Sequence, residues 1–99
     1  MCGITGLWNR SGASDISAVT AMRDALRHRG PDDAGVETWP EHGVAFGHTR
    51  LAILDLSPMG HQPMHSHDSS LCITYNGEVY NFKEIRRQLE QLGHKFRSE

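Results

Sequence analysis

A cysteine stands directly behind the methionine that opens the chain, in the stretch MCGI. Methionine aminopeptidases act when the second side chain is small, so removal of Met1 would give Cys2 both a thiol and a free α-amino group. An unperturbed α-amino group has a pKa of about 7.7–8.0, so much of it is a neutral base at neutral pH. A thiol beside such a base is an activated nucleophile. Cys2 is therefore a candidate catalytic residue.

Two further stretches could bind a negatively charged group. Arg50 lies at the edge of an apolar strand pattern, where an arginine is either a surface residue or a bidentate clamp for a carboxylate. Asn76 and Gly77 form an Asn-Gly pair, which is the strongest short signal for a hairpin turn. The same pair offers a side-chain amide and an unhindered backbone N–H, two donors that can hold an oxyanion. The residues alone leave both alternatives open.

Three histidines, His61, His65 and His67, lie close together in a loop that contains prolines, and Asp68 follows them. Zinc sites favour histidines set on a helix or a tight knuckle, commonly with cysteine pairs. The loop has no CxxC or HExxH frame. We therefore interpret these residues as solvated and expect no metal site. A small histidine-rich metal-binding protein is the alternative, which a measurement of metal content would test.

The composition indicates a folded, water-soluble chain of one small domain or part of a larger one. Its 99 residues are 37% hydrophobic and 22% charged, with a net charge of −2. No basic field favours nucleic acid or a membrane surface, and the apolar runs are too short to span a bilayer. The N-terminus lacks a signal-peptide pattern, so the expected location is the cytoplasm. Cys72 has apolar neighbours and is expected to be a buried thiol rather than the disulfide partner of Cys2.

Apolar periodicity and turn signals predict an α+β layout with mainly antiparallel strands. The second helix is expected to begin at an Asn81 cap and to bury one apolar stripe. That stripe consists of Phe82, Ile85, Leu89 and Leu92. In chain order the predicted elements are a strand over 2–8, a helix capped by Ser14 or Asp15 and stopped at Gly30 and Pro31, strands over 35–39 and 43–50, a long irregular loop over 57–70, a hairpin over 71–82, a helix over 81–93 and the start of a strand over 94–99.

The stretch HRGPDDAG, residues 28–35, joins the first helix to the next strand. Gly30 and Pro31 stop a helix and begin a turn. Arg29, Asp32 and Asp33, packed around a rigid proline, could equally organise a charged loop at a domain contact. The residues alone do not decide between these interpretations.

Four stretches together resemble the class II, N-terminal-nucleophile glutamine amidotransferase domain of glutamine-hydrolysing asparagine synthetases. They are MCGI.G at the start, RHRGPDDAG, GHTRLAILDLSPMGHQPM and YNGEVYNFKEIRRQLEQLGHKFRS. The resemblance runs in order along nearly the whole chain. Related amidotransferases of amino-sugar synthesis carry an RGYDSAG-like loop and an HNG-like turn, so RGPDDAG and YNGEVYN favour the asparagine synthetase branch.

The resemblance implies a role for each candidate residue. Cys2 would attack the side-chain amide carbon of glutamine, and its own α-amino group would accept and return the proton. The Asn76 side chain and the Gly77 N–H would hold the oxyanion, so the same Asn-Gly segment would be both turn and oxyanion hole. Arg50 would pair with the α-carboxylate of glutamine. The residues expected to contact glutamine are Arg50, Leu51, Ile53, Asn76, Gly77 and Glu78.

The resemblance also implies a larger architecture, the α+β four-layer sandwich of N-terminal-nucleophile hydrolases, of which residues 1–99 would be the N-terminal portion. The family's aspartate for the substrate amino group would come just after Glu99. The remainder of the amidotransferase domain and a synthetase domain would follow. The glutaminase step would need no cofactor, and ATP and Mg²⁺ are expected only in the synthetase domain. The expected partners are glutamine, that synthetase domain in the same chain and a second copy in a homodimer, with no nucleic acid or membrane.

The sequence therefore predicts a glutamine amidotransferase that hydrolyses glutamine through a Cys2 thioester. In the full-length parent, the ammonia would serve the ATP-dependent amidation of aspartate to asparagine. The ninety-nine residues alone are expected to be inactive. The alternatives are a non-catalytic truncated homologue or interaction module, and an amidotransferase domain that serves a different amide acceptor.

Overall fold

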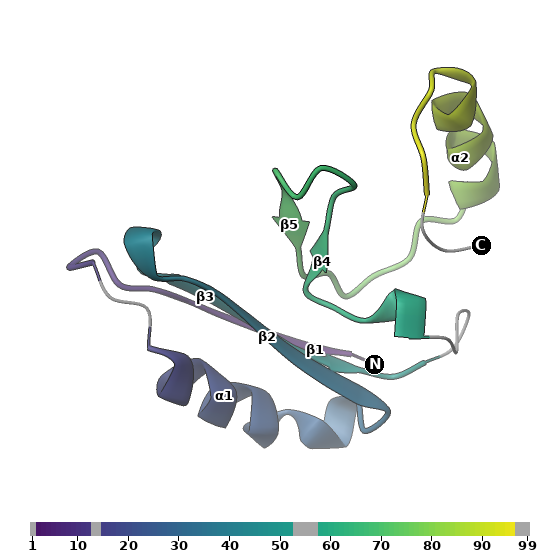
Figure 1. Ribbon diagram of the computed structural model, residues 1–99. Helices are drawn as coiled ribbons and strands as arrows, with labels where there is room; N and C mark the ends of the chain where they lie inside the picture. The colour runs from purple at the N-terminus through teal and green to yellow at the C-terminus, as the bar shows by residue number, and fades with distance from the viewer. Residues whose placement is uncertain (1, 13–14, 53–57, 97–99) are drawn as a thin grey trace.

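The centre of the molecule is a three-stranded antiparallel sheet. The computed structural model describes residues 2–12, 15–52 and 58–96. The strands β1 (Gly3–Trp8), β2 (Asp33–Trp39) and β3 (Val44–Arg50) lie in the order β1-β3-β2, so β3 is paired on both edges (Figure 1). A short 3₁₀ turn, Pro40–His42, joins β2 to β3. The strands predicted on either side of this turn are confirmed.

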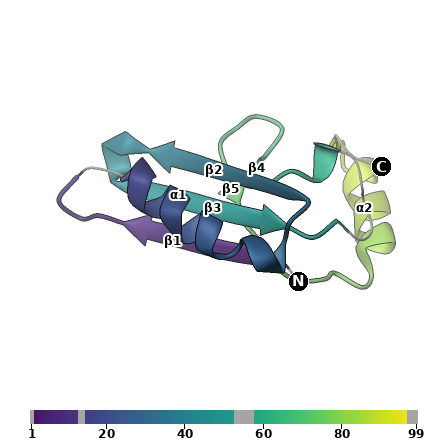
Figure 2. The ribbon, with the colours of Figure 1, turned by 90° about the horizontal axis from the view of Figure 1, so that it is seen from below.

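Helix α1 (Ile16–Ala25) covers one face of this sheet (Figure 2). The predicted cap is confirmed at Asp15, whose Oδ1 accepts a hydrogen bond from the Ala18 N–H at 3.0 Å. Val19 on the helix and Ala45 on β3 are completely buried. Because side chains alternate along a strand, the α1 side of β3 also carries Thr49. Its Oγ1 accepts from the Gly3 N–H at 3.1 Å and donates to the Leu26 carbonyl at 3.2 Å.

The opposite face of the sheet meets a smaller unit. Strands β4 (Met64–His65) and β5 (Cys72–Ile73) form a two-stranded antiparallel pair, and a 3₁₀ turn, Pro58–Gly60, precedes them. The predicted irregular loop over 57–70 thus contains a short strand. Helix α2 (Phe82–Gln91) stands apart from the three-stranded sheet (Figure 1). Residues 94–96 form no strand, and residues 97–99 lie outside the described part of the chain.

The hairpin predicted over residues 71–82 is wrong. β5 pairs with β4, which precedes it in the sequence, and not with a strand after the Asn-Gly pair. Residues 74–81 form no strand. The Tyr75 N–H donates to Oε1 of Gln62 at 2.7 Å, and the Tyr75 ring lies against Gly77. These contacts with distant and neighbouring groups outweigh the local preference of an Asn-Gly pair for a hairpin turn, because strand pairing depends on tertiary context.

The apolar stripe predicted to be buried on α2 is largely exposed, and Leu89 is its one half-buried member. Phe82, Ile85 and Leu92 are 43%, 38% and 76% exposed, and α2 has no buried residue. Asn81 occupies the cap position, but its side chain makes no capping hydrogen bond. Periodicity identifies which face of a helix is apolar, whereas burial needs a second layer against that face. The described residues do not supply that layer.

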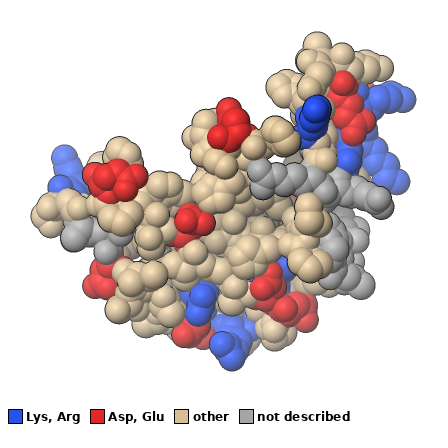
Figure 3. Space-filling model, viewed as in Figure 1, with Lys and Arg blue, Asp and Glu red and all other residues tan. Residues whose placement is uncertain are grey.

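The charged groups are mixed as the composition indicates, whereas Cys72 is less buried than predicted. Figure 3 shows acidic and basic side chains interspersed over the visible face. Within the described ranges, no helix has both the length and the apolar character needed to cross a bilayer. Cys2 and Cys72 are both free thiols, and each is half-buried rather than fully buried.

Substitution of Thr49 by valine tests the contact between β1, β3 and the end of α1. The change keeps the shape of the side chain but leaves the buried Gly3 N–H without its Thr49 acceptor and removes one of two donors to the Leu26 carbonyl, which still accepts from the Arg29 N–H. We expect the free energy of unfolding to fall by about 1–3 kcal/mol, the usual cost of such groups. Urea unfolding curves measure this change.

Thr5→Val is the matched control, because Thr5 Oγ1 is buried without a hydrogen-bond partner among the described residues. This substitution should leave stability unchanged or raise it, since it removes an unsatisfied polar atom. Equal losses in the two variants would contradict the assigned role of Thr49.

Candidate active site

Cys2 lies immediately before β1, where the antiparallel register brings it to the end of β3. The last β1–β3 pair is Gly3 with Thr49, so Cys2 reaches the strand end beyond it. The Leu51 N–H donates to Sγ at 3.3 Å, and the thiol points back at the Leu51 carbonyl at 3.8 Å. The backbone carbonyl of Cys2 accepts from Nε of Arg29 at 3.3 Å. The thiol is therefore held beside Leu51 by the sheet register and not by the N-terminus alone.

Arg50 is the last residue of β3 and is only 8% exposed. This burial excludes the interpretation of Arg50 as a surface residue. Its guanidinium lies against Gly60, where any added Cβ would collide with it. A Cβ at Gly30 would likewise collide with the Arg50 backbone. Both glycines thus permit a close approach of the chain to Arg50, which directly precedes Leu51, the residue that contacts the Cys2 thiol.

The segment at residues 29–33 contains both the predicted helix stop and a charged loop, and the domain contact expected for that loop stays a prediction. A short 3₁₀ turn, Arg27–Arg29, follows α1 and ends at Gly30, and the Asp32 N–H then donates to the Arg50 carbonyl at 3.0 Å. The Asp32 carboxylate accepts from the Ala52 N–H at 2.9 Å. The helix stop and the charged loop are therefore one structure, which joins the N-terminus to the end of β3.

Asp33 pairs with His61 at the same edge of the site, with 2.6 Å between Oδ2 and Nδ1. Burial raises the pKa of Asp33, but the hydrogen bonds from His61 and from the Ala34 backbone outweigh it, and the charge of Arg50 adds to them. The net pKa of Asp33 is below its usual value, so the carboxylate stays ionised at neutral pH. It ties the loop after the Pro58–Gly60 turn to the start of β2.

Asn76, Gly77 and Glu78 lie in the irregular segment between β5 and α2. Asn76 is half-buried, and the other two are exposed. Within the described ranges, no hydrogen bond joins Asn76 or Gly77 to Cys2. The structure thus brings together Cys2, Arg50 and Leu51 but does not join the Asn-Gly pair to them. Ile53, the other predicted pocket residue, lies outside the described residues.

The histidine loop is occupied by contacts of its own. His65 Nε2 lies 3.0 Å from the Glu37 carboxylate, and His61 is paired with Asp33 as described above. Hydrogen bonds from Ser70 and Ser66 lower the pKa of Asp68 to about 2. Across the parts of the chain that the structure describes, no three His, Cys, Asp or Glu side chains gather in a metal-binding cluster.

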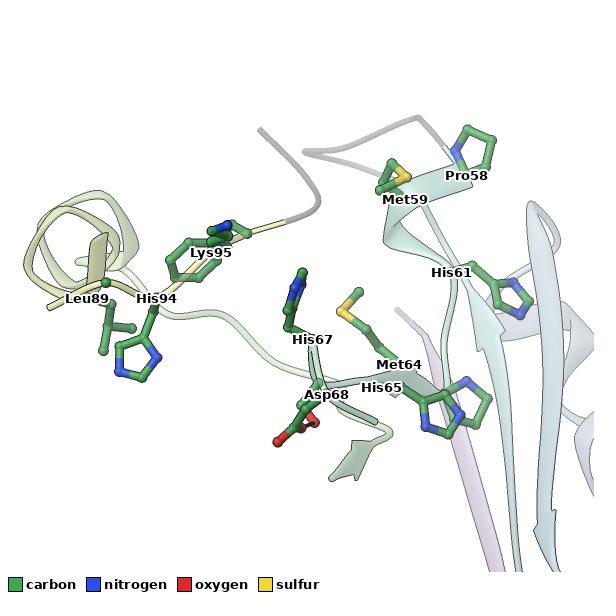
Figure 4. A pocket seen from close by; sticks show the side chains of 14 residues that line it. Pro58, Met59, His61, Met64, His65, His67, Asp68, Leu89, His94 and Lys95 are labelled. Atoms are coloured by element: carbon green, nitrogen blue, oxygen red, sulfur yellow. Dashed lines mark hydrogen bonds between the residues drawn. The ribbon is translucent and has the colours of Figure 1, made fainter. Parts of the chain in front are cut away.

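A cavity of about 890 Å³ opens between this loop and the end of α2. Met64 and His67 reach into it from the loop, and Leu89, His94 and Lys95 lie on the other wall (Figure 4). Neither Cys2 nor Arg50 lines this cavity. Its lining offers no thiol, so the candidate nucleophilic chemistry belongs to the end of β3.

Sequence reasoning missed several residues that shape this site. Gly60 fits against Arg50, and Gln62 accepts from the Tyr75 backbone. His48 is 1% exposed, and its Nδ1 lies 2.9 Å from Thr74 Oγ1. Side chains alternate between the two faces of a strand, so the sequence places His48 on the same face of β3 as Arg50. This alternation could have identified His48 as a residue near the site. The Gly60 and Gln62 contacts depend on loop geometry and have no comparable signal.

Residues 1–99 match the family model of a glutamine amidotransferase domain. The chain is 42% identical over 100 residues to asparagine synthetase (glutamine-hydrolyzing) 3 of Bacillus subtilis (strain 168), covering 97% of this chain and 16% of that protein. It is 41% identical over 101 residues to an asparagine synthetase (glutamine-hydrolyzing) of Asparagus officinalis, covering 99% and 16%. It is 34% identical over 100 residues to amidase chry2 of Gibberella zeae, covering 90% and 15%.

The chain therefore spans only about 16% of the length of these curated relatives. No solved structure matches it.

The two thiols should be distinguishable by alkylation. Burial raises the pKa of Cys72, and the nearby Glu37 carboxylate raises it further. A raised pKa lowers the thiolate fraction at neutral pH, so Cys72 should react with iodoacetamide more slowly than free cysteine. Glu37→Gln should accelerate the reaction by removing one of the two causes. Peptide mass mapping over time measures both rates. A Cys72 that reacts faster than free cysteine, or that Glu37→Gln leaves unaffected, would contradict this electrostatic assignment.

Proposed function

The chain belongs to the glutamine amidotransferase domain family, and from this premise we propose that Cys2 hydrolyses the side-chain amide of glutamine. The observation that carries the proposal is the position of Cys2 directly behind Met1, with its Sγ against the backbone of Leu51, the residue that follows the buried Arg50. A thiol nucleophile next to a buried cation suits a substrate that carries both an amide and a carboxylate.

The reaction begins once Met1 is removed and the α-amino group of Cys2 is free. That amine accepts the thiol proton as Sγ attacks the amide carbon, and a tetrahedral oxyanion forms. The amine returns the proton to the leaving nitrogen, the C–N bond breaks, and ammonia departs. A thioester remains on Cys2. Water, deprotonated by the same amine, then attacks the thioester and releases glutamate and the thiol.

Arg50 binds the α-carboxylate of glutamine in this proposal. Its planar guanidinium donates two parallel hydrogen bonds, a geometry that lysine cannot reproduce. Leu51 lines the pocket beside it in this proposal, and Ile53, to which the resemblance assigns the same role, lies outside the described residues. Burial of Arg50 supports this role, because a cation in a water-poor site gains more from an anionic ligand than a solvated one does.

The Asn76 side chain and the Gly77 N–H stabilise the oxyanion, and Glu78 lies toward the amino group of the substrate. The proposal requires residues 76–77 to approach Cys2 when glutamine binds. Hydrogen bonds of this kind are often long or absent in a ligand-free enzyme and tighten in the complex.

The wider role rests on the similarity of the chain to much longer relatives. We propose a parent protein in which this chain is part of a four-layer N-terminal-nucleophile sandwich joined to a synthetase domain. There the ammonia amidates an aspartate activated by ATP and Mg²⁺, as the names of the asparagine synthetase relatives support. A different amide acceptor is the second candidate, because a relative of similar coverage is named an amidase.

Replacement of Cys2 by alanine tests the nucleophile. In the full-length protein, Cys2→Ala should abolish glutamate release from glutamine and leave ammonia-dependent synthesis largely intact, because only the thioester step needs the thiol. Cys72→Ala is the matched control and should retain glutaminase activity. A protein that loses glutaminase activity through Cys72→Ala but keeps it in Cys2→Ala would show the assignment to be wrong.

Arg50 and Asn76 should have different kinetic signatures. Arg50→Lys removes a contact already made in the ground state, so KM for glutamine should rise by about 10–100-fold, the worth of a charge-assisted hydrogen bond. Asn76→Ala removes a donor used in the transition state, so kcat should fall by roughly 10²–10³-fold. Steady-state glutaminase kinetics separate the two effects. An Asn76→Ala variant with normal kcat and only a raised KM would remove Asn76 from the oxyanion hole.

A further inference from the structure

His48 is a buried polar residue that the proposed reaction does not use. It lies in the middle of the molecule on β3, with only 1% of its surface exposed. Its Nδ1 is 2.9 Å from the hydroxyl of Thr74. Polar groups at this depth cost stability unless they are hydrogen-bonded, so the contact with Thr74 is the one that makes this residue tolerable in the fold.

The charge state and tautomer of His48 follow from its surroundings. Burial lowers the pKa of His48, nearby His61 and Arg50 lower it further, and Asp33 only partly opposes them. The ring is therefore neutral at neutral pH. Its Nε2 is buried and has no hydrogen-bond partner among the described residues. Because an unpaired buried N–H is costlier than an unpaired acceptor, the proton belongs on Nδ1, which donates to Thr74 Oγ1.

His48 stands on the same face of β3 as Arg50. Side chains at positions i and i+2 of a strand point to the same side. The contacts agree with this rule, because Thr49 bonds to the α1 side at Leu26 while His48 bonds to Thr74 on the other side. Thr74 is thus attached to the strand that ends in Arg50.

The segment attached in this way carries Asn76 and Gly77. Thr74 precedes Asn76 by two residues, and residues 74–81 have no strand pairing to hold them. The next residue, Tyr75, is held by the Gln62 side chain at 2.7 Å. Gln62 lies two residues after Gly60, the glycine that contacts the Arg50 guanidinium. Two side-chain hydrogen bonds therefore fix the approach to the Asn-Gly pair relative to Arg50.

We propose that His48 is a positioning residue, whose hydrogen bond to Thr74 anchors the start of the segment from which Asn76 and Gly77 close on the oxyanion formed at Cys2. The inference rests on the proposed function of the site. A donor pair must be held to within about half an ångström to be effective. The segment that carries it has no regular secondary structure, so its precision depends on the His48–Thr74 and Gln62–Tyr75 bonds.

The test uses glutaminase kinetics of the full-length protein with changes at Thr74, which is only half-buried. Thr74→Val keeps the shape and removes the hydroxyl, so kcat should fall by about tenfold, the effect of one hydrogen bond, while KM for glutamine changes little. Thr74→Ser keeps the hydroxyl and should restore kcat. His48→Gln leaves no polar atom at the Nδ1 position, so the bond to Thr74 is lost and kcat should fall by a similar factor. The double variant should lose no more than the larger single loss, because both changes break one bond.

The outcomes separate this inference from the proposed function. Loss of glutaminase in Cys2→Ala together with an unchanged kcat in Thr74→Val would overturn the role of His48 and leave the proposed function standing. Equal loss of kcat in Thr74→Val and Thr74→Ser, with a lowered melting temperature in both, would show a merely structural role and also overturn it. Retained glutaminase in Cys2→Ala would overturn the proposed function itself.

Discussion

The pairing of β3 along both of its edges is the constraint on which the rest of the structure depends. The β1 register carries Cys2 to the end of β3, and the β2 register brings Asp33 opposite Arg50. Alternation along β3 then divides its side chains between two layers, with Thr49 facing α1 and His48 and Arg50 facing the loop after the Pro58–Gly60 turn. The strand register thus brings residues that are far apart in the sequence together at the end of β3.

The elements set by local pattern were predictable from the sequence. The Asp15 cap, the stop at Gly30 and the β2–β3 turn each depend on residues within a few positions of one another, and the structure confirms them. The Asn-Gly hairpin was not predictable, because the pairing of β5 with β4 and the anchor from Gln62 are long-range contacts. Likewise, the periodicity of α2 identifies its apolar face correctly, but only a second layer, which no local pattern reveals, could bury that face.

The candidate site was predictable to a similar degree. Cys2 and Arg50 stood out because a terminal thiol and an arginine in an apolar strand are unusual choices of residue. Their proximity, and the close fit of Gly60 against the guanidinium, follow from strand register and loop packing and could not be read from spacing. The thiol and the cation lie at the end of paired strands, whereas the segment that carries the Asn-Gly pair has no strand pairing and is anchored at Thr74 and Tyr75 by side-chain hydrogen bonds.

The central claim is that Cys2 acts as an N-terminal nucleophile toward glutamine. Mass spectrometry of the full-length protein after treatment with an electrophilic diazoketone analogue of glutamine tests it most directly. We expect a single adduct on the N-terminal peptide, with Met1 absent and Cys2 as the first residue, and we expect excess glutamine to prevent its formation. An adduct on Cys72, or glutamine hydrolysis by protein that demonstrably retains Met1, would show that Cys2 is not an N-terminal nucleophile.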